Sequence, residues 1–175
     1  MEELIDVLNE DGTKTGKVVT RKEVHEKGLW HKIVVIAIID KEGNVLMQQR
    51  AKDKETNPGK WDISVAGHVS AGQTSIESAI REVKEEIGMD VEEKDLQYML
   101  TYQTGRKVKD NFYANHIFDV YLVKTEGIDI SKIKIQESEV EQVKLCNLEE
   151  VQNMLSNNLV AERKHVYEML IKYLK

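Results

Sequence analysis

The chain has 175 residues, of which 41% are hydrophobic and 32% charged, and its formal net charge is −6. This length and composition predict one domain over residues 1–175 with a substantial core, and they exclude a disordered or fibrous protein. The acidic balance argues against binding to a nucleic-acid polymer, because proteins that track phosphates carry clustered basic surface, whereas small anionic ligands remain open.

The beginning of the chain and its cysteine usage favour a cytoplasmic location. The N-terminal segment MEELIDVLNEDG is acidic and lacks the apolar core of a secretory signal. The longest apolar run, Ile33 to Ile39, has seven residues and is far too short to cross a bilayer, so we expect no membrane partner. Cys146 is the only cysteine, which excludes an internal disulfide framework and a thiolate zinc cluster, and we expect it to be a small buried apolar residue.

Strand patterns dominate the chain up to about residue 148, and helices close it. The expected elements, in chain order, are two short strands around a turn at Asp11 and Gly12 (3–20), a short helix closed by Gly28 (21–28), a hairpin that turns at 42–44 (31–50), a polar loop (51–61), a short strand ending at Gly67 (61–67), a helix that ends at Gly88, three strands (96–105, 111–123 and 140–148) and two helices (148–157 and 161–175). This order predicts a mixed β-sheet flanked by helices.

The helix that ends at Gly88 gathers three carboxylates. At about 100° per residue, Glu82, Glu85 and Glu86 occupy an arc of roughly 100°. The apolar stripe that must face the core borders this arc instead of opposing it. Like charges one turn apart repel, so either these side chains point into open water or a cation lies among them. Oxygen ligands on adjacent turns suit Mg²⁺ or Mn²⁺, and the pattern alone leaves both interpretations open.

Residues 67–89, GHVSAGQTSIESAIREVKEEIGM, resemble the Nudix box, G-x5-E-x7-R-E-U-x-E-E-x-G-U, in which U is a bulky aliphatic residue. The positions that match at the correct spacing are Gly67, Arg81, Glu82, Val83, Glu85, Glu86, Gly88 and Met89. One position departs, because Gln73 stands where the box has its first glutamate. Glutamine keeps the size and the hydrogen bonding of glutamate but gives up the charge.

The resemblance implies a Nudix fold of the α/β (α+β) class, a mixed β-sheet between α-helices with the box as a loop–helix–loop. It implies that Glu82 and Glu86 are the main ligands of Mg²⁺ or Mn²⁺, that Glu85 assists, and that a backbone carbonyl near Ala66 or Gly67 contributes. It gives Arg81 the role of orienting the glutamates. Metals held in this way would bridge diphosphate oxygens and acidify a water that attacks phosphorus.

A longer segment, from about residue 3 to residue 90 and more loosely to residue 150, resembles the Nudix subgroup related to isopentenyl-diphosphate isomerase. Residues 1–30 would then be an N-terminal β-hairpin extension. The isomerase needs a cysteine immediately before the Gly-His of NPGKWDISVAGHV, where this chain has Ala66, and a glutamate pair where it has Tyr113 and Asn115. Alanine cannot transfer a proton to or from an allylic carbon, so we do not expect isomerase activity.

In the isomerase, histidines of segments comparable to those around His25, His31 and His68 help to form a metal site. His25 and His31 lie six residues apart, which does not place them on one helical face, and the missing glutamates would leave such a site short of ligands. We therefore expect His25 and His31 at a strand or loop edge and His68 in a local hydrogen bond, with none of them a metal ligand.

Candidates for the rest of the site lie outside the box. Glu139, with Glu137 as the substitute, is the candidate general base from the segment before a late strand, and a solvated acidic turn is the alternative. The candidate phosphate contacts are Arg50, Lys52 and Lys60, with Lys54 and Arg106 as further candidates.

Apolar positions of the last helix, Val166, Leu170, Ile171 and Leu174, would pack on the sheet or on a second subunit of a homodimer, a state common in the family.

Together these patterns predict a metal-dependent hydrolase, with Glu85 and Glu139 as catalytic residues. It would cleave a diphosphate (pyrophosphate) linkage in a small molecule, a nucleoside diphosphate linked to another moiety. Two alternatives stay open. One is an isomerase-like enzyme with altered chemistry, and the other, motivated by Gln73, is a catalytically silent Nudix domain that binds a nucleotide or a protein.

Overall fold

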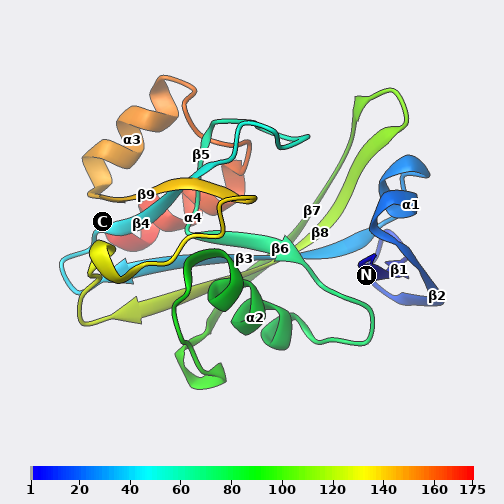
Figure 1. Cartoon of the computed structure of the whole chain (residues 1–175), viewed down its shortest axis with the longest axis horizontal. Coiled ribbons are helices and arrows are strands. Elements are labelled where there is room, and N and C mark those ends of the chain that lie inside the picture. The colour runs from blue at the N-terminus through cyan, green and yellow to red at the C-terminus, as the bar shows by residue number, and fades with distance from the viewer. Residues whose placement is uncertain (1) are drawn as a thin grey trace.

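Two β-sheets and four α-helices make up residues 2–175, the part of the chain that the structure, a computed structural model, describes (Figure 1). The strands are β1 (Leu4–Leu8), β2 (Lys14–Thr20), β3 (His31–Asp40), β4 (Val45–Arg50), β5 (Trp61–Asp62), β6 (Val65–His68), β7 (Gln97–Lys109), β8 (Phe112–Thr125) and β9 (Val140–Cys146). The helices are α1 (Arg21–Glu26), α2 (Ser75–Ile87), α3 (Leu148–Ser156) and α4 (Lys164–Leu174), with short 3-10 turns η1 (Glu93–Asp95) and η2 (Ile130–Lys132).

Strand β3 is the centre of the main sheet, whose order is β5-β4-β3-β8-β7 with β6 paired to β3 and β9 paired to β4. β3 runs parallel to β8 and antiparallel to β6, so the sheet is mixed as the sequence predicts. Its residues are apolar on both faces because both faces are covered. Val34, Ile36 and Ile38 pack with α2 on one side, and Ile33 and Val35 pack with α3 and α4 on the other.

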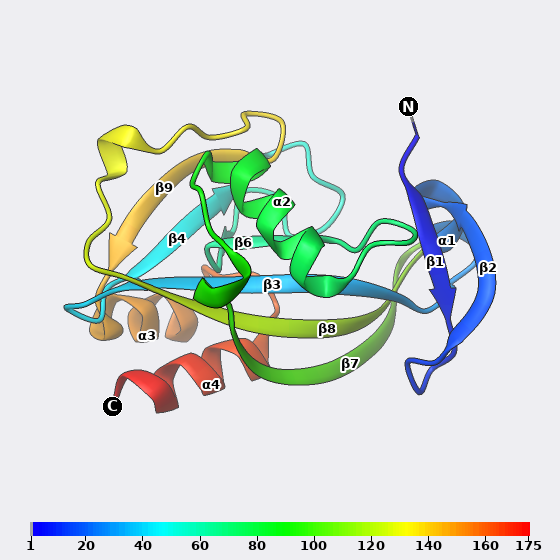
Figure 2. The same ribbon diagram turned by 90° about the horizontal axis from the view of Figure 1, so that it is seen from below.

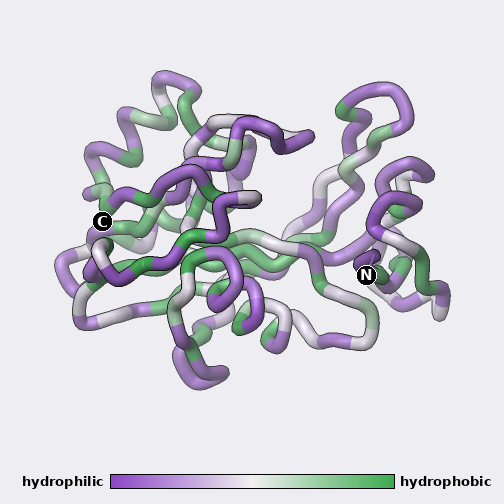
Figure 3. Tube along the Cα trace, viewed as in Figure 1, coloured by the Kyte–Doolittle hydropathy of each residue, from purple (hydrophilic) through white to green (hydrophobic). Residues whose placement is uncertain are grey.

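The two helical layers lie on opposite faces of the sheet (Figure 2). Apolar segments gather on the central strands, whereas the loops and outer helix turns are hydrophilic (Figure 3). Cys146 is buried, and Val166 and Leu170 of α4 are fully buried against the sheet. No helix within residues 2–175 is long and apolar enough to cross a membrane.

Local signals account for the boundaries of α2. Thr74 caps its N-terminus, and Thr74 and Glu77 form a reciprocal capping box that satisfies two otherwise unpaired backbone donors. Gly88 ends the helix in the left-handed conformation, with φ of 69°, which glycine adopts without the steric penalty of a side chain.

The first sheet, β1 with β2, lies with α1 at one end of the main sheet (Figure 1). Two backbone hydrogen bonds hold β1 there, from Leu8 N to Trp30 O at 2.8 Å and from Ala71 N to Leu4 O at 2.7 Å. This attachment brings α1 against the start of β8.

Three expectations about the strands need correction. The segment 61–67 forms two strands, β5 beside β4 and β6 beside β3. The expected hairpin of β3 and β4 pairs only at Ile39 and Val45, because the strands separate and Ser64 is inserted between them. Its hydroxyl accepts from Ile38 N at 2.8 Å and donates to Leu46 O at 2.5 Å. Strand β7 continues past residue 105 to Lys109, since it stays paired with β8.

Candidate active site

A cavity of about 830 Å³ lies where β6, α2, the loop after β4 and the loop before β9 meet. Its wall carries carboxylates from α2, basic side chains from the loops, and histidines from α1, β6 and β8. Glu82, Glu85, Glu86 and Glu139, all singled out from the sequence, line this one cavity.

Glu82 packs directly on the backbone of Gly67. A Cβ built at residue 67 would overlap the carboxyl carbon and both carboxylate oxygens of Glu82. The pairing of Gly67 with Val34 fixes this part of β6 beside the central strand. Glycine is therefore required here by close approach and not by its backbone conformation, and Ala66 is brought to the same wall of the cavity.

Arg81 joins the acidic residues to the strand. Its Nη1 lies 2.9 Å from both Glu82 Oε1 and Glu85 Oε2, and its Nη2 donates to the carbonyl oxygen of His68 at 3.0 Å. A planar guanidinium can make these contacts at once, which a lysine ammonium could not do with the same geometry. The arrangement matches the orienting role that the resemblance implies for Arg81.

Gln73 belongs to the same network. Its Oε1 accepts from Ser78 Oγ at 2.9 Å and from Arg81 Nε at 3.3 Å. The amide oxygen of Gln73 therefore accepts a hydrogen bond from Arg81, as a carboxylate oxygen would. Compared with the glutamate of the Nudix box, Gln73 gives the cavity wall one negative charge less but still supports Arg81.

Glu86 is the most enclosed of the three α2 carboxylates, with 4% of its surface exposed against 8% for Glu82. Gln48 Nε2 donates to Glu86 Oε2 at 2.9 Å. Burial, followed by the charge of Glu82, raises the pKa of Glu86 to about 8, and burial raises that of Glu82 to about 7. Arg81 contacts Glu82 and Glu85 but not Glu86 and so offsets only part of this negative charge, and the donor set fits a divalent cation.

Glu139 faces the cavity from the loop before β9. Its carboxylate accepts from Lys54 Nζ at 2.5 Å, and its carbonyl oxygen accepts from Ala51 N at 3.0 Å. The neighbouring Gln136 and Ser138 also line the cavity, whereas the substitute candidate Glu137 is not among the described lining residues.

The basic candidates differ in position. Arg50 lines the cavity, but its guanidinium is engaged by Thr56 O at 3.0 Å and by Asp62 at 3.6 Å. Lys54, a further candidate, lines it as well. Among the described residues the lining does not include Lys52, which pairs with Glu141 at 2.9 Å, or Lys60, which donates to Asn158 at 3.3 Å. Arg106 pairs with Glu162 beside a second cavity.

The sequence reasoning missed Arg163. Its Nε donates to the fully buried Asp62 at 2.6 Å, and the side chain lines the cavity. Arg163 precedes α4, far from the box in sequence, and no local pattern distinguishes it from an ordinary surface arginine.

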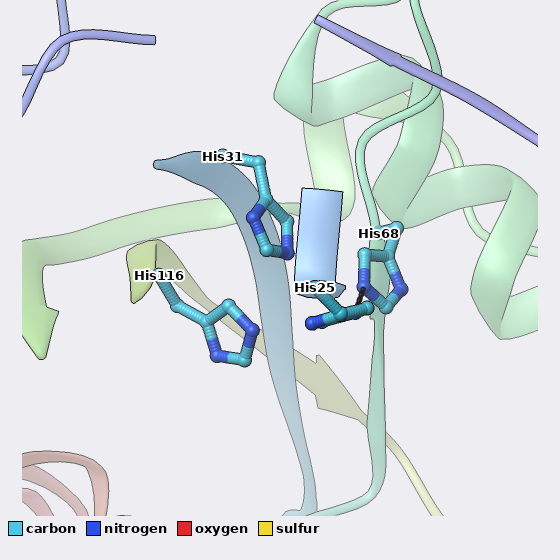
Figure 4. A group of neighbouring side chains, drawn as sticks. All are labelled: His25, His31, His68 and His116. Atoms are coloured by element: carbon cyan, nitrogen blue, oxygen red, sulfur yellow. Dashed lines mark hydrogen bonds between the residues drawn. The ribbon is translucent and has the colours of Figure 1, made fainter. Parts of the chain in front are cut away.

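Four histidines form a cluster that the sequence reasoning did not predict (Figure 4). One ligand atom from each of His25, His31, His68 and His116 lies within 4.8 Å of the others. His31 begins β3, as expected for a strand edge, but His25 lies within α1. The expected local hydrogen bond of His68 was wrong, because its ring bonds to His25. β6, β3 and β8 are neighbouring strands, so His68, His31 and His116 meet at one end of the sheet, and α1 adds His25.

Tyr113 and Asn115, which stand where the isomerase has glutamates, position α1 in this chain. The carbonyl oxygen of Tyr113 lies 2.9 Å from His25 Nδ1, and Asn115 Nδ2 donates to Gly28 O at 2.8 Å. The Asn115 side chain therefore has a structural role beside the histidine cluster, whereas Tyr113 contributes its backbone carbonyl.

The comparisons with known proteins agree with the fold. The family model described as NUDIX domain matches residues 29–170, which leaves β1, β2 and α1 outside the match. The chain is 39% identical over 158 residues to Nudix hydrolase 3 of Arabidopsis thaliana, covering 89% of this chain and 20% of that protein. It is 34% identical over 152 residues to an uncharacterised Nudix hydrolase of Listeria monocytogenes, covering 87% of this chain and 84% of the relative.

The resemblance to the isomerase subgroup is also present, at 33% identity over 105 residues with an isopentenyl-diphosphate Delta-isomerase of Serratia proteamaculans, covering 60% of this chain and 58% of that protein. Among solved structures, the DR0079 protein of Deinococcus radiodurans has the same fold, with a TM-score of 0.71, 17% identity, and coverage of 97% of this chain and 98% of that one.

The fold is that of the Nudix class. With a family model that spans most of its length and a relative matched over most of both chains, this chain belongs to the Nudix hydrolase family and has the Nudix fold.

Proposed function

We propose that this protein is a divalent-metal-dependent hydrolase that cleaves a diphosphate linkage in a small molecule, a nucleoside diphosphate joined to another moiety. The observation that carries the proposal is the pair of enclosed carboxylates, Glu82 and Glu86, on adjacent turns of α2 in the wall of one cavity. Arg81 offsets part of the negative charge of this pair, and a bound divalent cation would stabilise the ionised form of both carboxylates at neutral pH.

Glu82, Glu86 and Glu85, with the carbonyl oxygen of Ala66, are the residues that would hold Mg²⁺ or Mn²⁺. When bound, a cation of this kind neutralises phosphate charge and lowers the pKa of a water molecule. Arg81 holds Glu82 and Glu85 in place through its contacts at 2.9 Å. Arg50 and Lys54 place positive charge in the same cavity, where a diphosphate would lie.

Glu139 is the proposed general base. Its carboxylate would take a proton from the water whose oxygen attacks phosphorus, while the bridging P–O bond breaks and the bridging oxygen leaves with the second phosphate. Lys54, at 2.5 Å from Glu139, orients this carboxylate. Glu85, half exposed at the cavity, is the second proposed catalytic residue.

Two alternatives carry less support. Ala66 offers no group for proton transfer to carbon, which disfavours an isomerase-like reaction. A silent binding domain would rest on Gln73, but the three α2 glutamates are all retained at the cavity. A cytoplasmic location and a homodimer stay predictions from the sequence, as does the expectation that nucleic-acid polymers are not substrates.

Product release from a panel of nucleoside-diphosphate compounds, with Mg²⁺ or Mn²⁺ present, tests the proposal. We expect metal-dependent turnover of at least one compound and its loss in Glu86→Gln. The matched control is Glu126→Gln, at an exposed loop glutamate away from the cavity, which should retain full activity. Metal-independent turnover, or equal activity of Glu86→Gln and the control, would contradict the proposal.

A further inference from the structure

The histidine cluster has the electronic character of a ligand set. The carbonyl oxygens of Tyr113 and Leu29 can only accept hydrogen bonds, so His25 Nδ1, at 2.9 Å, and His31 Nδ1, at 3.0 Å, carry the protons. In the neutral imidazole the other nitrogen then has a free lone pair. The Nε2 atoms of His25 and His31, which carry these lone pairs, lie on the inner side of the cluster. Figure 4 shows the four rings gathered around this space.

Two of the inner nitrogens have no partner in the described part of the protein. Within residues 2–175, the buried Nε2 atoms of His31 and His116 have no hydrogen-bond partner. His25 Nε2 and His68 Nε2 lie 3.1 Å apart and have only each other as partner among the described residues. Buried polar atoms without partners are costly and rare, so two of them beside a pair of histidine nitrogens call for a ligand that accepts electron pairs.

Protonation of the four imidazole rings is disfavoured. Burial lowers the pKa of all four imidazoles, to about 3 for His31 and well below the usual value for His68 and His116. Burial thus favours the neutral form of each ring, which is the form that binds metal ions.

We propose that His25, His31, His68 and His116 bind one divalent transition-metal ion of the zinc class, at a site separate from the carboxylates of α2. Four neutral imidazoles suit Zn²⁺ and its neighbours and disfavour Mg²⁺, which prefers oxygen ligands. Tetrahedral nitrogens bonded to zinc at about 2.1 Å lie about 3.4 Å apart. The observed spread of up to 4.8 Å would contract to that value when an ion binds.

The surroundings prepare the site for such an ion. Carbonyl groups fix the tautomers of His25 and His31, as outer partners do for metal-bound histidines. Phe112 stacks on the His25 ring with centroids 4.5 Å apart and the planes at 10°, which limits rotation of that ring. His25, His68 and His116 also line the cavity of the carboxylates, so the ion would form a second positive centre beside the proposed diphosphate position.

The test uses the full chain, stripped with a chelator and then titrated with Zn²⁺ in the presence of excess Mg²⁺. We expect one tightly bound Zn²⁺ per chain. His116→Asn should weaken the affinity by more than about 100-fold, the upper end of the effect of losing even an outer partner. His165→Asn is the matched control, because His165 is the remaining histidine and its side chain is exposed on α4. His165→Asn and Glu86→Gln should both retain the Zn²⁺.

X-ray absorption of the Zn²⁺-loaded wild-type protein avoids any folding defect of a variant. We expect imidazole nitrogens as the nearest neighbours of the ion, at about 2.0 to 2.1 Å. Oxygen ligands without imidazole scattering, unchanged affinity in His116→Asn, or loss of Zn²⁺ in Glu86→Gln would overturn the proposal. None of these readouts depends on hydrolase activity, so the outcome is independent of the proposed function.

Discussion

The substitution Gly67→Ala tests the contact between β6 and the acidic helix. All three carboxyl heavy atoms of Glu82 would lie closer than 3.0 Å to the new Cβ, a separation that real Cβ atoms essentially never show, whereas ordinary contact begins at 3.4 Å. The carboxyl group must therefore shift, by roughly 1 Å or more, and a misplacement of this size at a catalytic site costs on the order of 100-fold in rate. Because the displaced atoms are the far end of the Glu82 side chain, the free energy of unfolding should change little.

The assay for Gly67→Ala is kcat/KM for a diphosphate substrate, with Mn²⁺ affinity by calorimetry and the fold checked by circular dichroism. Gly127→Ala is the matched control, because a Cβ there meets no atom within 4 Å and its φ does not lie in the positive range. We expect the control to behave as the wild type. If Gly67→Ala kept wild-type activity and Mn²⁺ affinity, the inferred dependence of the metal site on this contact would be refuted.

Three further predictions follow from the same geometry. Arg81→Lys keeps the charge but loses the fork that joins Glu82, Glu85 and the carbonyl of His68, so kcat/KM should fall about 10–100-fold, and equal rates in variant and wild type would contradict the orienting role. Gln73→Glu adds a negative charge beside Arg81 at the cavity wall and should tighten Mn²⁺ binding in calorimetry, whereas weaker binding would count against the assigned position. Because the folded-state pKa of Glu86, about 8, exceeds the ordinary value of 4.5, the folded state binds more protons between these values. The stability of the metal-free protein should therefore fall as pH rises from 4.5 to 8, by at most about 1.4 kcal/mol per pH unit for one carboxyl. Thermal melts with and without Mg²⁺ measure this slope, and Glu86→Gln should flatten it, so a slope unaffected by that substitution would be inconsistent with the raised pKa.

Local patterns predicted the parts of the fold that are decided locally. The apolar stripe and Gly88 predicted which face α2 buries and where it ends, whereas its N-cap, Thr74, was not singled out. The position of Glu82 and Glu86 at the border of that stripe was enough to predict that their carboxylates cluster beside the packed face of the helix. The three carboxylates of this wall of the cavity therefore come from one continuous segment.

The parts that depend on distant partners were not predicted. Ser64 separates β3 from β4 through contacts with residues about 20 positions away, so the sequence suggested a longer hairpin than forms. Four histidines of α1, β3, β6 and β8 meet because the sheet places β3 between β6 and β8, an order that no spacing along the chain reveals. Likewise, Arg163 is held beside the cavity by its hydrogen bond to the buried Asp62, which is distant in sequence.

The central claim is that the enclosed carboxylates of α2 bind a divalent cation that hydrolysis requires. Calorimetric titration of the full chain with Mg²⁺, in the presence of a non-hydrolysable diphosphate compound, tests it most directly, because Mg²⁺ has little affinity for the histidine cluster. We predict saturable binding that is lost in Glu86→Gln and kept in Glu126→Gln. Absence of Mg²⁺ uptake by the wild-type protein, or uptake that survives Glu86→Gln, would contradict the account.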